Sequence, residues 1–250
     1  AYDILIGLVG SEMCIRDSFY TGVPEAQLEQ LTTDSSGQTD TIDLAAPPLE
    51  YSLNPENEVQ PYSEYTMQIT AEGFESVSIA GAEILADVTA IQNVSMKPID
   101  TPEDEETVFV IPAHTLYATY PPKIPEDEIQ PTFESGEIVL SRVVVPEYIV
   151  VHDGSPRDST AKNYYVKYKD YIKNVASSEI YATWPENTIR ANVLAIMSFT
   201  LNRVYTEWYR NQGYDFTITS STAFDHKWIP ERNVFDSIST VCLLYTSDAA

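Results

Sequence analysis

The sequence predicts an α+β protein, in which an all-β region precedes a region of helices and strands. Residues 19–97 contain short runs that alternate apolar with polar residues, separated by turn signals. Alternation of this kind is typical of half-buried strands. Apolar residues at helical spacing appear after residue 147, and a segment rich in proline and acidic residues, 98–146, lies between. We therefore expect two modest domains joined by a linker.

The all-β region is expected to form a small sandwich of short strands. The strand candidates are 39–44, 65–70, 77–79 and 88–96, and Gly73 and Gly81 separate three of them. Turns every eight to twelve residues are typical of sandwiches. Residues 61–98 (PYSEYTMQITAEGFESVSIAGAEILADVTAIQNVSMKP) also resemble the transthyretin-like or carboxypeptidase-regulatory-like β-domains of bacterial surface proteins.

The segment 98–146 carries eight of the sixteen prolines and the acidic run Glu103–Glu106. Proline fixes φ and removes a hydrogen-bond donor, so this density disfavours long ladders and helices. We expect a stiff linker that holds the domains apart, with short extended pieces such as 107–111.

Charge divides the chain at the same place. Residues 19–148 contain 24 acidic and three basic residues, whereas residues 149–240 contain ten of each. An acidic surface of this kind disfavours binding to nucleic acids and anionic lipids. No run of eighteen apolar residues occurs, so no membrane span is expected.

The two ends differ in character from the rest. Gly7–Ser18 (GLVGSEMCIRDS) and Val241–Ala250 (VCLLYTSDAA) resemble peptides translated from sequencing-adapter DNA, and they hold the two cysteines, Cys14 and Cys242. We expect residues 1–18 and 241–250 to be foreign, and the second domain, 147–240, to be incomplete. No disulfide is then expected within residues 19–240.

The second region contains two predicted helices after a short strand at 148–151. The first covers about 169–181, with Tyr168, Tyr171, Ile172 and Val175 on one face. The second begins at Pro185, a favoured first-turn residue, and is expected to end near Gly213.

The stretch Asp170–Arg203 resembles the core of the SpoIID/LytB family. Val175–Ile180 (VASSEI) matches that family's first block and Thr188–Thr200 (TIRANVLAIMSFT) its second, with Asn192 in place of the usual Gln. Members act on peptidoglycan, as lytic transglycosylases or as partners that enhance amidases. The resemblance implies a place outside the cytoplasm, in the cell envelope or spore cortex.

The domain arrangement is also similar to clostridial spore-cortex-lytic enzymes of the SleC type, which are made as precursors and cleaved. That similarity implies an activating protease that cuts the linker.

A lytic transglycosylase needs one proton shuttle, because the substrate's own C6 hydroxyl attacks to form a 1,6-anhydro product. Glu179 matches the family position for this acid, and its apolar neighbours favour a raised pKa. Tyr181 and Trp184 are expected to stack on sugar rings. Four further residues are assigned as substrate contacts: Asn192, Ser198, Asp225 and His226.

Other chemistries have weaker support. His152-Asp153 could be two metal ligands, but clustered ligand spacing is lacking, and the sequence favours a turn. The Ser-rich run Thr217–Phe224 could hold a nucleophile but lacks a G-x-S-x-G elbow. With no glycine-rich phosphate loop either, we expect neither a metal nor a cofactor. The competing functions are a non-catalytic cell-wall module that docks an amidase or anchors to glycan, and an envelope scaffold.

Overall fold

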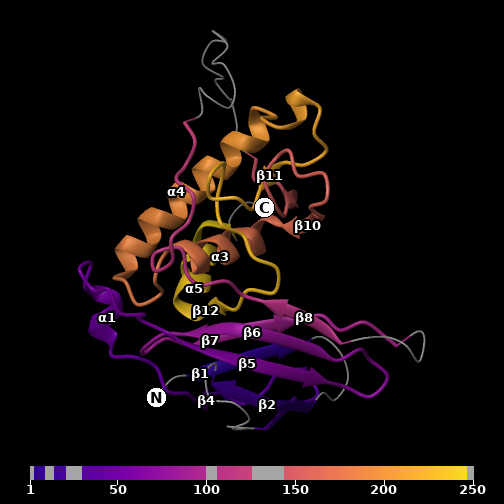
Figure 1. Cartoon of the computed structure of the whole chain (residues 1–250), viewed down its shortest axis with the longest axis vertical. Coiled ribbons are helices and arrows are strands. Elements are labelled where there is room, and N and C mark those ends of the chain that lie inside the picture. The colour runs from indigo at the N-terminus through magenta and orange to yellow at the C-terminus, as the bar shows by residue number, and fades with distance from the viewer. Residues whose placement is uncertain (1–2, 9–13, 21–29, 100–105, 126–143, 247–250) are drawn as a thin grey trace.

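The computed structural model describes residues 3–8, 14–20, 30–99, 106–125 and 144–246. Two β-sheets lie at one end of the molecule (Figure 1). Above them in that view lie the helices α3 (Tyr168–Glu179), α4 (Glu186–Tyr205) and α5 (Asp236–Thr246). The expectation of an α+β protein is confirmed at this level.

The larger sheet has five strands in the order β3-β2-β5-β6-β8. Their bounds are Leu31–Thr32, Cys14–Tyr20, Ser63–Thr70, Val77–Ile84 and Thr107–Val110. Along β5, Tyr65, Met67 and Ile69 are buried and the residues between them are partly exposed, as the alternation predicts. The expected boundary between residues 18 and 19 falls inside β2, so it does not coincide with the end of an element.

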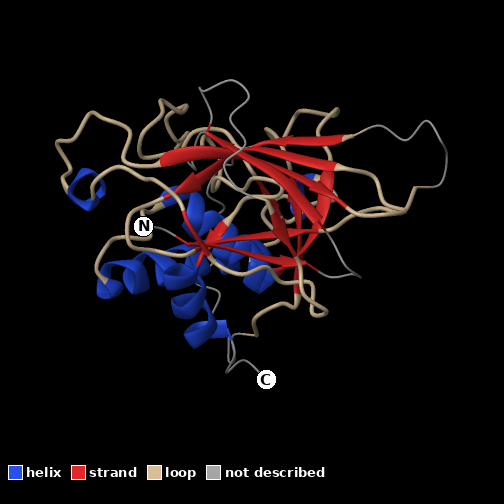
Figure 2. Cartoon of the chain, turned by 90° about the horizontal axis from the view of Figure 1, so that it is seen from below, coloured by secondary structure: helices blue, strands red, loops and turns tan. Residues whose placement is uncertain are grey.

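The second sheet draws on both ends of the chain. Its order is β12-β7-β1-β4, with bounds Val234–Phe235, Ala90–Val94, Asp3–Leu8 and Ile42–Asp43. Strand β12 comes from the region assigned to the second domain, yet it pairs antiparallel with β7 of the first. A short helix, α1 (Leu49–Leu53), follows β4 and was not predicted. Figure 2 shows it at the side of the molecule, apart from the longer helices.

Gly81 occupies a position in β6 that only glycine fits. The β5–β6 register shifts between Tyr65 and Met67, and Gly81 opposite this irregularity has φ +85°. A Cβ atom there would lie 2.4 Å from the backbone oxygen of Ile111. The close approach lets Ile111 N–H donate to Ala80 O at 2.8 Å and continue the pairing beyond β8.

The short extended piece expected at 107–111 is confirmed as β8, but the expectation of a linker that holds the domains apart is wrong for residues 107–124. Strand β8 pairs in parallel with β6, and the chain after it packs against the second region instead of spacing it away. His114 is buried, Thr115 N–H donates to Ser178 O, and Ile124 N–H donates to Ala223 O. The prolines at 112, 121, 122 and 125 allow this because they fall at irregular positions outside β8.

The second region contains a three-stranded sheet, β10-β9-β11, beside the helices. Its strands are Asn163–Lys167, Tyr148–His152 and Ile218–Thr219. The predicted apolar face of α3 is buried. Helix α4 ends at Tyr205, earlier than predicted, because Glu207 has φ +47°; Gly213 instead ends a short 3-10 turn at 210–212.

A buried ion pair joins the two regions. Arg232 donates from its two terminal nitrogens to both carboxylate oxygens of Glu83 on β6, at 2.8 and 2.5 Å, and also to Ser177 O on α3. Asn233 exchanges hydrogen bonds with the Glu83 backbone at 3.1 and 2.8 Å. Besides these polar contacts, one continuous apolar core runs through both regions.

Helix α5 crosses the expected boundary at residue 240, and Cys242 within it is buried in the core. The foreign origin of the two ends stays a prediction. Within the described part of the chain, no helix combines the length and apolarity needed to cross a membrane.

Candidate active site

Glu179 is the last residue of α3, where the chain turns into an extended conformation at Ile180. Its side chain is partly exposed, and its Oε1 accepts a hydrogen bond from Lys227 N–H at 2.7 Å. A backbone donor holds the carboxyl in one position without adding a full charge.

Burial raises the pKa of the Glu179 carboxyl to about 7, while the Lys227 N–H and the Lys123 ammonium act in the opposite direction. The ordinary value for a glutamate is well below this. A large share of Glu179 is therefore protonated at neutral pH, which is the state a general acid requires. The raised pKa that the sequence predicts for Glu179 has burial as its physical cause.

Lys123, Phe199 and His226 form a small cluster near this carboxyl. The Lys123 Nζ lies 4.0 Å from the Phe199 ring centroid, and the His226 ring packs on the same phenyl at 4.5 Å. Burial lowers the pKa of His226 to about 3, helped by Lys123 and Arg203. His226 is therefore neutral. Its ring is buried against Phe199, beside the site.

Asp225 is buried and fully engaged, so the expectation that it contacts substrate is wrong. Its carboxylate accepts from Arg203 Nε at 2.8 Å, from Tyr209 Oη at 2.6 Å, and from Thr219 N and Oγ1 at 2.9 and 2.7 Å. This network ties α4 to β11. A sugar hydroxyl could reach Asp225 only by displacing these partners.

Asn192 and Ser198 lie on α4 and hydrogen-bond to their own helix. Asn192 Nδ2 donates to Thr188 O at 2.9 Å, and the exposed Ser198 Oγ donates to Leu194 O at 2.8 Å. Neither has a contact to Glu179 among its hydrogen bonds in the described part of the chain. Ser198 precedes Phe199 and therefore lies near the Lys123 cluster along the helix.

Tyr181 and Trp184 line a groove of about 670 Å³. Their rings meet edge to face, with centroids 6.0 Å apart. Trp184 Nε1 donates to Ser52 O at 3.0 Å, so α1 of the β-region forms part of the same groove. Glu179 is two residues from Tyr181 in the chain but does not line this groove.

His152 and Asp153, which the sequence offered as alternative metal ligands, take part in local hydrogen bonds. Both ring nitrogens of His152 are engaged, one with Asn163 Oδ1 at 2.8 Å and one with Ser155 O at 3.1 Å. Asp153 accepts from Ser220 Oγ at 2.8 Å. These bonds join the ends of β9, β10 and β11. Among the described residues, no group of three His, Cys, Asp or Glu side chains could hold a metal ion.

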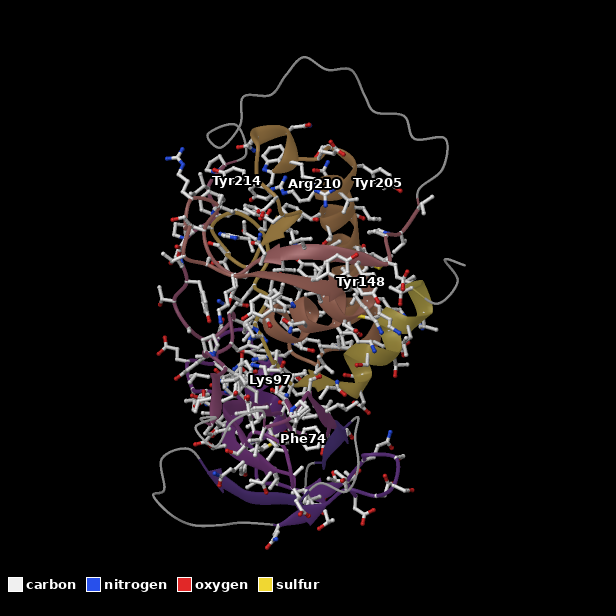
Figure 3. The ribbon with its side chains drawn as sticks, turned by 90° about the vertical axis from the view of Figure 1, so that its right-hand side faces the viewer. Phe74, Lys97, Tyr148, Tyr205, Arg210 and Tyr214 are labelled. Atoms are coloured by element: carbon white, nitrogen blue, oxygen red, sulfur yellow. The ribbon has the colours of Figure 1, made fainter. Side chains whose placement is uncertain are left out.

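A second group of aromatic residues lies at the opposite end of the second region. Tyr209, Tyr214 and Phe216 pack with ring centroids 4.9 to 6.1 Å apart. Figure 3 places Tyr214 far from Phe74 and Lys97 of the β-region. The aromatic residues of this half of the chain therefore include a cluster that packs together and a separate pair, Tyr181 and Trp184, that lines the groove.

Lys123 and Tyr117 are the residues of the site that sequence reasoning missed. Both lie in the segment expected to be a linker, and Lys123 stands between prolines with no motif around it. The pair Tyr117 and Tyr120, in an otherwise acidic and proline-rich segment, was the sequence signal that could have identified this part of the site.

Comparisons of the chain with protein-family models, curated proteins and solved structures found no match.

Proposed function

We propose that this protein cleaves the glycan strands of peptidoglycan as a lytic transglycosylase, with Glu179 as the acid and base. It would act outside the cytoplasm, in the cell envelope or spore cortex. The observation that carries the proposal is the carboxyl of Glu179, partly exposed at the end of α3 and held by the Lys227 N–H, where burial raises its pKa to about 7. The resemblance of residues 170–203 to the SpoIID/LytB core supports the same residue.

The reaction needs a single carboxyl group. Protonated Glu179 donates its proton to the glycosidic oxygen as the bond to the anomeric carbon breaks. The resulting carboxylate then accepts the proton of the C6 hydroxyl, whose oxygen bonds to the anomeric carbon and closes the 1,6-anhydro ring. Glu179 ends the cycle protonated, so no water is consumed and no second carboxylate is required.

Glu179→Gln tests the proposal. We expect cleavage of glycan strands lacking stem peptides to fall by about 10²–10⁴-fold, because an amide cannot donate the proton. The measurement is the yield of 1,6-anhydro ends. Glu186→Gln is the matched control, since Glu186 is exposed and its one ion pair among the described residues is with Arg190 on the same helix.

The competing function is a cell-wall module that binds glycan and recruits an amidase. The observation that favours it is the separation of the aromatic groove from Glu179. Glycan binding with no 1,6-anhydro ends from the wild-type protein would support the module and contradict the transglycosylase.

A further inference from the structure

The groove beside Tyr181 and Trp184 is built from three segments that lie far apart in the sequence. Residues 51–55, 57, 59 and 61, in and after α1, form one wall, Leu116 and Tyr117 a second, and residues 181, 184, 185 and 188 the third. Ligand pockets occur preferentially at such junctions, and a volume of about 670 Å³ is within their usual range. The junction between the two regions is therefore a candidate binding site.

The lining carries no charge. None of the described residues that border the groove is Asp, Glu, Lys, Arg or His, although the chain as a whole has a net charge of −24. Aromatic rings are prominent instead: Tyr51, Tyr117, Tyr181 and Trp184. A charged ligand would lose its hydration here without gaining a partner. The lining is complementary to a neutral ligand with apolar faces.

A row of rings holds two walls of the groove in place. The Tyr117 ring packs edge-on against Tyr62 at 6.0 Å, Tyr62 lies 6.3 Å from His114, and His114 lies 4.6 Å from Tyr181. Tyr62 and His114 are buried behind the groove. The positions of Tyr117 and Tyr181 are thus set before a ligand arrives.

Helix α1 is attached to the opposite wall by hydrogen bonds. Thr183 Oγ1 donates to Ser52 Oγ at 2.7 Å, next to the bond from Trp184 Nε1 to Ser52 O. Tyr51 is 37% exposed and Tyr117 is 43% exposed, so their rings and hydroxyls reach solvent. Rings presented in this way can stack on sugar C–H faces and donate to hydroxyl or acetamido oxygens.

We infer that this groove binds an uncharged run of N-acetylated sugars, and that α1 of the β-region supplies one wall of the subsite. The inference deepens the proposed function and rests on it for the identity of the natural glycan. Its physical basis is independent: aromatic faces, neutral polar groups and the absence of charge along the described lining. The β-region then takes part in substrate recognition.

The test is a titration of the full chain with the β-1,4-linked tetramer of N-acetylglucosamine. Calorimetry and tryptophan fluorescence measure its binding affinity. We expect Tyr117→Ala and Tyr51→Ala each to weaken binding by about tenfold, which is the value of one well-placed aromatic contact. Tyr165→Ala is the matched control, because Tyr165 is 73% exposed, stacks only on Tyr148 among aromatic side chains of the described chain, and does not line the groove. Tyr51→Ala keeps the test decisive if Tyr117→Ala fails to fold.

Three results would overturn the inference. The first is an affinity in both groove variants equal to that of the wild type, and the second is no binding of the tetramer to the wild type. The third is tighter binding of a neutral proline-rich peptide than of the tetramer. Glu179→Gln separates this inference from the proposed function: it should abolish cleavage but bind the tetramer as the wild type does. Loss of binding in the groove variants beside full cleavage by Glu179→Gln would uphold the subsite and reject the transglycosylase acid.

Discussion

At the scale of single residues, the environment of one carboxyl matters most. Glu179 and Asp225 are both acidic and both belong to the second region, but their surroundings differ in kind. Asp225 accepts four hydrogen bonds in the interior, whereas Glu179 accepts one from a backbone N–H. Several donors stabilise a carboxylate, and burial with few donors favours the protonated acid. Only the second arrangement suits proton transfer at neutral pH.

The pKa of Glu179 predicts a pH dependence of stability as well as of activity. Its folded-state pKa of about 7 lies above the ordinary value of 4.5, so the folded state binds this proton more tightly than the unfolded state. The contribution to stability is therefore complete below pH 4.5 and is lost as the pH rises through about 7. We expect the free energy of unfolding of the wild type, relative to Glu179→Gln, to decrease across this window.

Denaturant titrations of both proteins at pH 4.5, 6 and 8 measure this difference. The rate of glycan cleavage should also fall as the pH rises above about 7, where the acid is deprotonated. A wild type that tracks Glu179→Gln at every pH would show that the carboxyl is not perturbed.

At the scale of elements, Gly81 decides how β6 and the chain after β8 fit together. The sequence identified Gly81 as a separator between short strands, but the glycine lies inside one eight-residue strand. Its left-handed φ fits the irregularity in β6, and its lack of a side chain leaves room for Ile111 O, which would lie 2.4 Å from a Cβ at this position. The segment that follows Ile111 then reaches α3, where Thr115 N–H donates to Ser178 O.

Gly81→Ala should lower the free energy of unfolding by more than about 2 kcal/mol, because a left-handed residue with a Cβ is strained and the new methyl also meets backbone. Gly73→Ala is the matched control: its φ is +82°, but nothing lies within 4 Å of the added Cβ. It should cost about 1–2 kcal/mol from strain alone. Equal losses in the two variants, measured by urea denaturation, would contradict the role of the close approach.

At the scale of the whole molecule, the two regions share one core, and we expect them to fold as one unit. The Glu83–Arg232 pair is buried at their junction, β12 of the second region joins a sheet of the first, and the core is continuous. A buried ion pair that loses one partner leaves an uncompensated charge. The junction therefore makes folding of either region dependent on the other.

Arg232→Met should destabilise the protein by about 3–5 kcal/mol, since it leaves Glu83 buried without its partner. Arg190→Met removes an exposed pair on one helix and should cost less than about 0.5 kcal/mol. Adding Glu83→Leu to Arg232→Met should recover much of the loss. Fluorescence and circular dichroism should report one coincident transition in the wild type; two separate transitions would contradict a single unit.

Local pattern alone determined much of this protein's secondary structure: the period-2 burial of β5, the apolar face of α3, and the start of α4 after Pro185. These depend on residues close in sequence, whose spacing places them on one face. Only the tertiary structure decided that the chain after β8 packs against the second region, that Asp225 is enclosed by Arg203 and Tyr209, and that α1, Tyr117 and Trp184 share one groove. Contacts between distant segments leave no periodic signal along the chain, because they depend on how the sheets and helices assemble.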